Sequence, residues 1–187
     1  MAPLDVDGSY ELTVRFMRTS GNDTVGIVLP VGTKTVLLGL GYGGNRSHGL
    51  DRVDGKGGGD AANPTVLRPA RIENDREYVA HVKVIVHGDQ AEVFVDLDDK
   101  AIINWRGSPS AFAMYKGWRL PQSNRVGLGV SNGSACFLSA QLRMLSGEAK
   151  PLRPGGVAQP EPPPKGPDGN PANFFGVPFD KLRDRPK

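Results

Sequence analysis

The chain has 187 residues, a formal net charge of +3 at pH 7, 25 glycines and 16 prolines. This length accommodates one domain with a core plus a tail, but not two ordinary domains. The excess of turn-forming residues favours an all-β chain over long helices. The small net charge, with both signs interspersed and no basic stripe, argues against nucleic acid as a partner.

No apolar run approaches the roughly 18 residues of a membrane span, and nothing at Met1 resembles a signal peptide. We therefore expect a soluble chain with no membrane span, in a compartment that stays unknown. Because strand-like alternation already begins at Tyr10, the chain could be a piece of a longer polypeptide. The sole cysteine, Cys136, excludes an internal disulfide and is expected to be a small buried residue of its strand.

The first expected strands form a meander over residues 10–16, 25–31 and 35–40, where apolar and polar residues alternate. Residues 41–64 are a long glycine-rich region in which only residues 50–53 resemble a strand. Loops of this length in a compact domain commonly carry function or lie at the rim of the fold. This region is therefore one of the places to look for a site.

The strongest pattern is a hairpin over residues 78–98. The alternation is interrupted only by Gly-Asp at 88–89, which suits a two-residue type II′ turn and pairs His87 with Gln90. In that register the apolar side chains of both strands share one face, and a second layer must cover them. The valines concerned are Val82, Val84, Val86, Val93 and Val95.

A further strand over residues 101–105 completes a three-stranded meander. Ser108 and Pro109 resemble a helix N-cap followed by proline, and Gly117 resembles a terminator, which predicts either a helix of about two turns over residues 111–116 or a loop. Two more strands end the pattern, at 126–130 and at 135–145, with a shared apolar phase at Cys136, Leu138, Ala140, Leu142 and Met144.

About eleven short strands predict an all-β fold, a two-sheet antiparallel sandwich with at most one short helix. We expect this domain to occupy residues 1–146, followed by a proline-rich linker and tail over residues 147–187. The tail contains an apolar segment that either folds back as a strap or docks on a protein partner. Its aromatic residues are Phe174, Phe175 and Phe179.

Several motifs stand out within residues 9–146, namely YELTVRF, GLDRVDGK with NPT, HVKVIVHGDQAEVFVDLDDKAIINWRG, Trp118 and VGLGVSNGSACFLSAQLRML. Together they resemble the concanavalin A-like lectin/glucanase superfamily. The likeness is to bacterial laminin-G-like domains of unassigned function and to the 3-keto-disaccharide hydrolase domain. It implies a jelly-roll, often with a ligand groove on the concave face or at the loop rim. Asp99 departs from the pattern, since such domains usually place glycine there.

Retaining glucanases of this superfamily carry E-x-D-x-x-E on one strand, so that two carboxyl groups lie about 5 Å apart. The comparable stretch here begins at Glu92, but Phe94 and Leu97 replace the two later acids. Asp96 should lie opposite His81. This pair could act in general acid/base catalysis, but we favour an ion pair on a solvated face. We expect no catalytic residue, and whether the chain is an enzyme stays open.

Oxygen ligands for calcium could come from Asp51, Asp54 and Asp60 with Asn63, although Lys56 among them argues against this. We expect no metal ion and no cofactor, and the calcium question stays open. Gly43-Gly44 and the glycines at 57–59 do not join a strand to a helix, so they predict no phosphate loop.

Sugar binding rests on aromatic faces with polar groups nearby. The candidate ligand-binding residues lie in or beside predicted loops, and they are Trp118, Tyr42, Tyr115, Asn45, Arg46 and Asp51. The first hypothesis is a non-catalytic module that binds a carbohydrate or a protein surface within a larger assembly. The alternatives are a glycoside hydrolase of the 3-keto-disaccharide type and a purely structural module that docks through its C-terminal tail.

Overall fold

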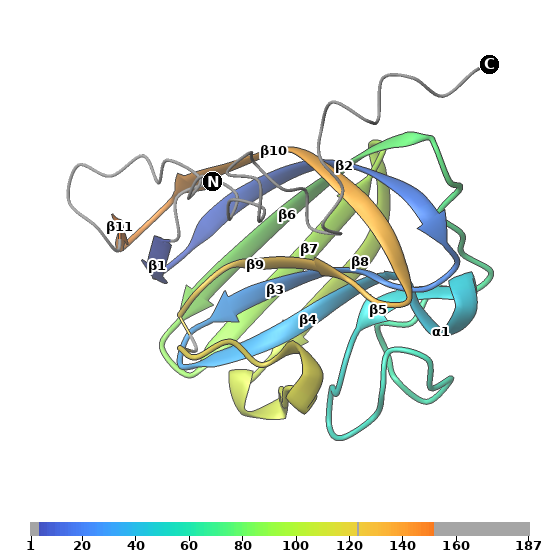
Figure 1. The fold of residues 1–187 in the computed structure, drawn as a ribbon. Coiled ribbons are helices and arrows are strands. Elements are labelled where there is room, and N and C mark those ends of the chain that lie inside the picture. The colour runs from blue at the N-terminus through green and yellow to red at the C-terminus, as the bar shows by residue number, and fades with distance from the viewer. Residues whose placement is uncertain (1–3, 123, 152–187) are drawn as a thin grey trace, which may run out of the picture. The chain divides into compact units, whose positions relative to one another are not determined.

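The computed structural model describes residues 4–122 and 124–151. These residues form an antiparallel β-sandwich of eleven strands with one short helix (Figure 1). One sheet has the order β10 (Gly133–Met144), β2 (Tyr10–Gly21), β6 (Glu77–His87), β7 (Gln90–Leu97), β8 (Lys100–Gly107). The facing sheet has the order β5 (Ser47–Leu50), β4 (Lys34–Gly41), β3 (Val25–Val31), β9 (Gly127–Val130). The all-β sandwich expected from the sequence is therefore confirmed.

The predicted hairpin register is also confirmed. His87 pairs with Gln90 across the turn, Val84 lies opposite Val93, and Gly88 adopts a φ of +60° at the turn. Four of the five valines are buried, with Val86 partly so, and they face the apolar side of the four-stranded sheet. Full burial of one such side chain stabilises the fold by about 1.5–3 kcal/mol, so a shift of one residue would be costly.

The two facing sheets also share a buried hydrogen bond. Tyr10 of β2 is fully buried, and its hydroxyl donates to the carbonyl oxygen of Pro30 on β3 at 2.9 Å. Burial strongly raises the pKa of this phenol. Because a buried hydroxyl without a partner is costly, this bond fixes the position of β2 over β3.

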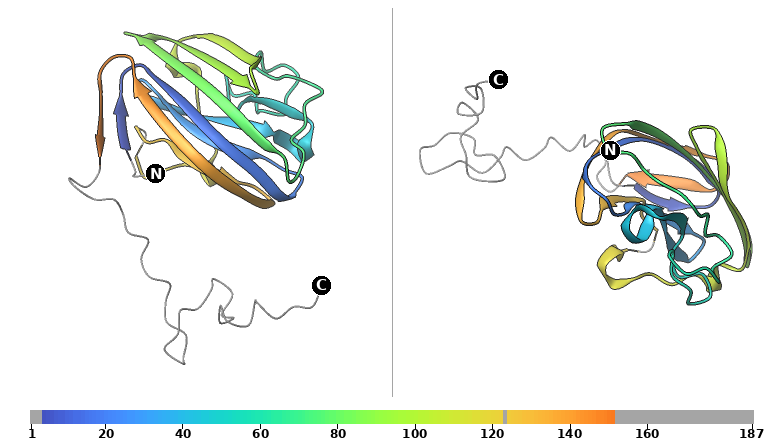
Figure 2. Two further views of the ribbon diagram at one scale, coloured as in Figure 1. Left: turned by 90° about the horizontal axis from the view of Figure 1, so that it is seen from above. Right: turned by 90° about the vertical axis from the view of Figure 1, so that its right-hand side faces the viewer.

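A third, two-stranded sheet joins β1 (Leu4–Asp7) to β11 (Glu148–Pro151), which lie side by side (Figure 2). The ion pair between Arg125 and Asp5, at 2.9 Å, ties β1 to the segment before β9. Strand β11 lies beyond residue 146, where the sandwich was expected to end. The rest of the expected tail, including the segment with Phe174, Phe175 and Phe179, lies outside the described residues.

Two local expectations differ from the structure. Residues 111–116 do not form the helix that was one of the two possibilities expected there. They run from the end of one 3-10 turn, Pro109–Ala111, to the start of another, Lys116–Trp118, and Ser108 caps the first turn by accepting from the Ser110 amide. The short strand in the glycine-rich region is β5, at residues 47–50 rather than 50–53. None of the helices in the described part of the chain is long and apolar enough to cross a membrane.

The expectation that Cys136 is buried is wrong. A register shift between Phe137 and Ser139 leaves Leu138 as an extra residue in β10, so the inward phase changes at this bulge. Phe137 packs against the core, whereas Leu138 is 50% exposed and the Cys136 thiol is exposed. Beyond the bulge the expected phase is restored, and the inward residues are Ala140, Leu142 and Met144.

This placement predicts that the folded protein reacts with a thiol reagent at Cys136. We expect complete labelling of one thiol in native buffer, at a rate that does not rise when small, non-denaturing concentrations of urea are added, because no opening of the fold is needed. The measurement is the time course of reaction with a chromogenic disulfide. A rate that instead follows the unfolding equilibrium would contradict the exposed position.

Candidate functional site

A row of glycines crosses the outer face of the four-stranded sheet. Gly129 of β9 pairs with Gly26 of β3, Gly26 with Gly39 of β4, and Gly39 with Gly49 of β5. A Cβ atom on Gly26 would lie 2.5 Å from the indole of Trp118, so this ring rests directly on the backbone. Because these residues have no side chains, their backbone forms a flat floor on which side chains from the loops can pack.

An aromatic groove of about 470 Å³ lies beside this floor. We use this name for the hollow between the segment that contains Tyr115 and Trp118 and the strand β9. Tyr115 is 46% exposed and Trp118 is half-buried. The segment lies on the side of the four-stranded sheet that faces away from the five-stranded sheet (Figures 1 and 2). The groove is therefore outside the core and open to a ligand.

Arg52 adds a positive charge beside the aromatic groove, and it was not among the residues predicted from the sequence. Its guanidinium carbon lies 5.6 Å from the centroid of the Tyr115 ring, and its Nε lies 4.0 Å from the Asp51 carboxylate. Arg52 adopts a φ of +57°, an uncommon conformation for a side chain of this size, while its carbonyl accepts from the Ala113 amide at 3.1 Å. An arginine in a glycine-rich loop has no periodic signal, so only the folded geometry identifies it.

Tyr42 and Asp51, two predicted ligand residues, lie under the glycine-rich loop. The Tyr42 ring packs between Gly39 and the loop glycines Gly58 and Gly59, where added Cβ atoms would lie 2.8–3.3 Å from it. Asp51 is 2% exposed and accepts from the Gly58 amide at 2.8 Å. Burial, together with the Asp51 carboxylate, raises the pKa of Tyr42. The structure thus brings these two residues to each other, and neither lines the aromatic groove.

Three of the four residues considered for calcium, Asp51, Asp60 and Asn63, are engaged by the loop itself. The Asn63 amide donates to the carbonyl oxygens of Leu50 and Lys56 at 2.7 and 3.0 Å, and Asp60 accepts from the Ala62 amide at 2.9 Å. Among the described residues, no group of three or more His, Cys, Asp or Glu side chains is arranged to hold a metal ion.

Asn45 and Arg46 line a different hollow of about 460 Å³, which we call the arginine pocket. Its lining is completed by residues 68–71 and includes Arg68 and Arg71. The helix α1 (Tyr42–Asn45) is a tight turn rather than a regular helix, since Gly43 and Gly44 both have left-handed φ values. Because such a turn suits glycine, the GYGGN sequence explains how Arg46 comes to the rim.

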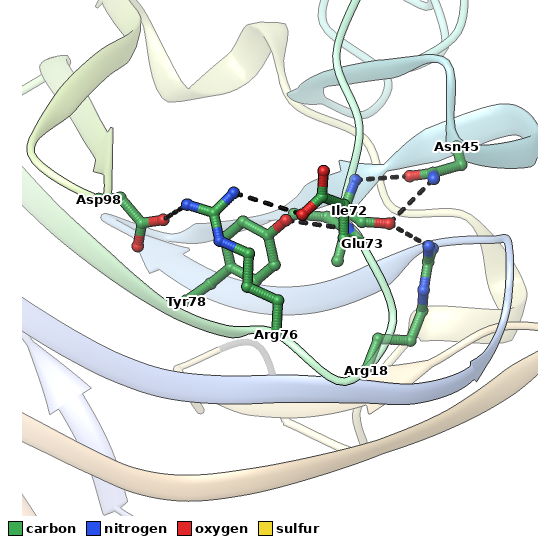
Figure 3. Close-up of polar contacts among 7 residues, drawn as sticks. All are labelled: Arg18, Asn45, Ile72, Glu73, Arg76, Tyr78 and Asp98. Atoms are coloured by element: carbon green, nitrogen blue, oxygen red, sulfur yellow. Dashed lines mark hydrogen bonds and ion pairs between the residues drawn. The ribbon is translucent and has the colours of Figure 1, made fainter.

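The segment 67–72, which forms the pocket wall beside Arg46, is held by hydrogen bonds at both of its ends. Leu67 and His48 exchange two backbone hydrogen bonds of 2.9 and 3.2 Å. At the other end, the side chain of Asn45 donates to the Ile72 carbonyl at 2.9 Å and accepts from the Ile72 amide at 2.7 Å. The buried Arg18 guanidinium donates to the same Ile72 carbonyl (Figure 3). Asn45 therefore orients the pocket wall, with both ends of its amide engaged.

A second group of contacts continues this anchor toward β6. The hydroxyl of Tyr78 accepts from the Glu73 amide at 2.9 Å, and Arg76 lies over the Tyr78 ring, with its guanidinium carbon 4.6 Å from the ring centroid. Arg76 also forms ion pairs with Glu73 at 3.7 Å and Asp98 at 2.9 Å (Figure 3). The chain that leaves the arginine pocket is thus held against the start of β6 and the turn that follows β7.

The outer face of the five-stranded sheet has the charged pattern expected from the sequence. His81 lies opposite Asp96, as predicted, but the two side chains do not form the expected ion pair, and the His81 Nδ1 is instead 3.1 Å from the Thr13 hydroxyl. Cross-strand ion pairs lie elsewhere on this face, including Arg106 with Glu92 at 3.6 Å. This arrangement is typical of a solvated face.

No protein-family model matches the sequence, and a search of curated proteins finds none that is similar to it. The likeness to the concanavalin A-like superfamily therefore stays an expectation based on the sequence motifs.

The contact between the glycine row and Trp118 predicts that Gly26→Ala displaces the indole. We expect the free energy of unfolding to fall by about 1–3 kcal/mol, as for an overpacked site, and acrylamide quenching of tryptophan fluorescence to increase. Gly57→Ala is the matched control, because its Cβ would meet only Asp51 at 3.5 Å, an ordinary contact. Equal effects of the two substitutions in urea unfolding would show that the indole does not rest on Gly26.

His48 predicts a pH dependence of stability. The Gly41 amide donates to its Nδ1 at 3.0 Å, and burial lowers its pKa from the ordinary 6.5 to about 4. The unfolded chain therefore binds the proton more readily, and stability should be lost as the pH falls from 6.5 toward 4, by up to about 3 kcal/mol. His48→Asn keeps an acceptor for Gly41 and does not titrate. Urea unfolding across this window should give a smaller slope for His48→Asn than for the wild type, and an unchanged slope would refute the assignment.

Proposed function

We propose that this domain is a non-catalytic binding module that holds a carbohydrate in the aromatic groove, as one part of a larger polypeptide or assembly. The observation that carries the proposal is the exposed Tyr115 ring beside Trp118, whose indole is supported by backbone glycines. Aromatic faces supported in this way present apolar area with little loss of side-chain freedom on binding, which suits the apolar face of a pyranose ring.

Polar groups at the same groove support sugar recognition. Arg119 and Ser131 line it, and Arg52 lies against the Tyr115 ring. These side chains supply hydrogen-bond donors for hydroxyl groups, as in sites that combine apolar walls with a few polar groups. The groove volume of about 470 Å³ falls within the range typical of small-ligand sites.

The carboxylates favour binding over hydrolysis. Among the described residues that line the aromatic groove there is no aspartate or glutamate. Asp51 is buried and accepts a backbone amide, and Asp96 lies on the charged face of the other sheet. Glycoside hydrolysis requires two carboxyl groups that flank one bond, so no specific observation supports the hydrolase alternative.

The proposal is tested by a glycan array followed by titration calorimetry with the glycans that bind. Tyr115→Ala should weaken binding about fivefold, which corresponds to about 1 kcal/mol of lost aromatic contact. Leu138→Ala is the matched control, because Leu138 is similarly exposed at 50% but lies on β10, outside the groove.

Two results would count against carbohydrate binding in this groove. One is an equal loss of affinity in Tyr115→Ala and Leu138→Ala. The other is an array without any bound glycan, combined with a protein partner whose binding Tyr115→Ala abolishes, which would make the groove a protein-binding surface.

A further inference from the structure

The arginine pocket gathers several arginines that are not paired with carboxylates. Six other arginines lie within ion-pair distance of a carboxylate, namely Arg15, Arg52, Arg76, Arg106, Arg125 and Arg143. Arg119 also forms no ion pair with a described carboxylate, but it is the only arginine among the residues that line the aromatic groove. Arg46, Arg68 and Arg71 form no ion pair with any carboxylate in the described part of the chain, and all three line one hollow. Three positive charges are thus gathered in one place with no carboxylate partner among the described residues.

Two of these guanidinium groups are held in place by backbone carbonyls. Arg46 donates from Nε to the Gly43 carbonyl at 2.7 Å, and Arg68 donates from one Nη to the Gly59 carbonyl. A guanidinium has several further N–H donors, so most of the donors of each group remain for a ligand. Because part of the side-chain ordering is already present, a ligand loses less entropy when it binds.

The frame of the pocket is also fixed. Residues 67–72 are fastened to His48 and Asn45 by backbone and amide hydrogen bonds, and the Ala70 amide donates to the Arg46 carbonyl at 3.2 Å. Figure 3 shows the end of this frame, where Asn45 and Arg18 converge on Ile72. The three arginines therefore surround a preformed hollow on supported backbone.

We propose that the arginine pocket binds a small molecule of sugar size that bears a carboxylate, sulfate or phosphate group. The planar, forked guanidinium matches the oxygen atoms of these anions in paired hydrogen bonds, and like charges gathered together favour an anionic ligand. The pocket volume of about 460 Å³ exceeds that of a lone inorganic anion and falls in the range of small-molecule sites. This site is separate from the aromatic groove and does not depend on the carbohydrate proposal.

The first test compares ligands by titration calorimetry at an ionic strength of about 0.15 M, where long-range effects of exposed charges are largely screened. The probes are glucose 6-phosphate, glucuronate, glucose 6-sulfate, inorganic phosphate and neutral glucose. We expect at least one sugar anion to bind more tightly than both inorganic phosphate and glucose. The preferred sugar anion identifies the acidic group. Binding of glucose as tight as that of the anions, or of no anion at all, would overturn the proposal.

The second test uses two arginine variants with the same change of charge. Arg71 is exposed, and Arg71→Gln should weaken sugar-anion binding about tenfold or more, as expected when a charge-assisted pair of hydrogen bonds is lost. Arg119→Gln removes one positive charge at the aromatic groove and should leave anion binding unchanged. Equal losses in both variants would overturn the assignment to this pocket.

A third variant separates this inference from the proposed function. Tyr115→Ala should weaken binding of neutral glycans while it leaves sugar-anion binding unchanged, because Tyr115 does not line the arginine pocket. Loss of anion binding in Tyr115→Ala would place the anion in the aromatic groove and overturn the present assignment.

Discussion

Burial of two apolar sheet faces against each other is the constraint on which the structure depends. Each face consists of alternate residues, so it is formed only in one register, and the β6–β7 hairpin takes the register that places Val84 opposite Val93. The outer faces of the two sheets are not bound by this constraint, so their residue types can differ. On the five-stranded sheet that face carries ion pairs, whereas on the four-stranded sheet it carries glycines and covering loops.

This difference explains where ligand sites can form. A face covered with paired charges is solvated and has little apolar area to offer. The glycine row instead lets the Trp118 ring and the Tyr42 ring approach the backbone, and the loops that carry these rings leave hollows at their margins. The aromatic groove and the arginine pocket both depend on these loops, one beside the segment with Trp118 and the other beside α1.

The sequence predicted the fold best where the alternation of apolar residues and the type of turn indicate the same strand register. The hairpin around Gly88 satisfies both conditions, and its register was predictable residue by residue. The β10 bulge was not predictable, because its position depends on pairing with β2. With one extra residue at Leu138, the period-2 pattern assigns Cys136 and Leu138 to the inward face, although both are exposed. At residues 111–116 the sequence could not decide between a helix and a loop, because proline and an N-cap serine begin a 3-10 turn as well as a helix.

For the sites, the sequence identified residue types but not which residues come together. Aromatic side chains in loops were recognisable, yet the separation of Tyr42 from the groove at Trp118 follows from strand pairings between distant segments. Arg68 and Arg71 had no signal at all, since an exposed arginine is ordinary until its lack of a partner is known.

The packing of one ring on bare backbone also constrains how this sequence can change. The size of residue 118 and the absence of side chains at Gly26 and Gly129 are linked, because the indole fits only where both side chains are absent. Natural variants of this domain should therefore exchange these positions together, with a bulkier residue in the floor accompanied by a smaller one above it.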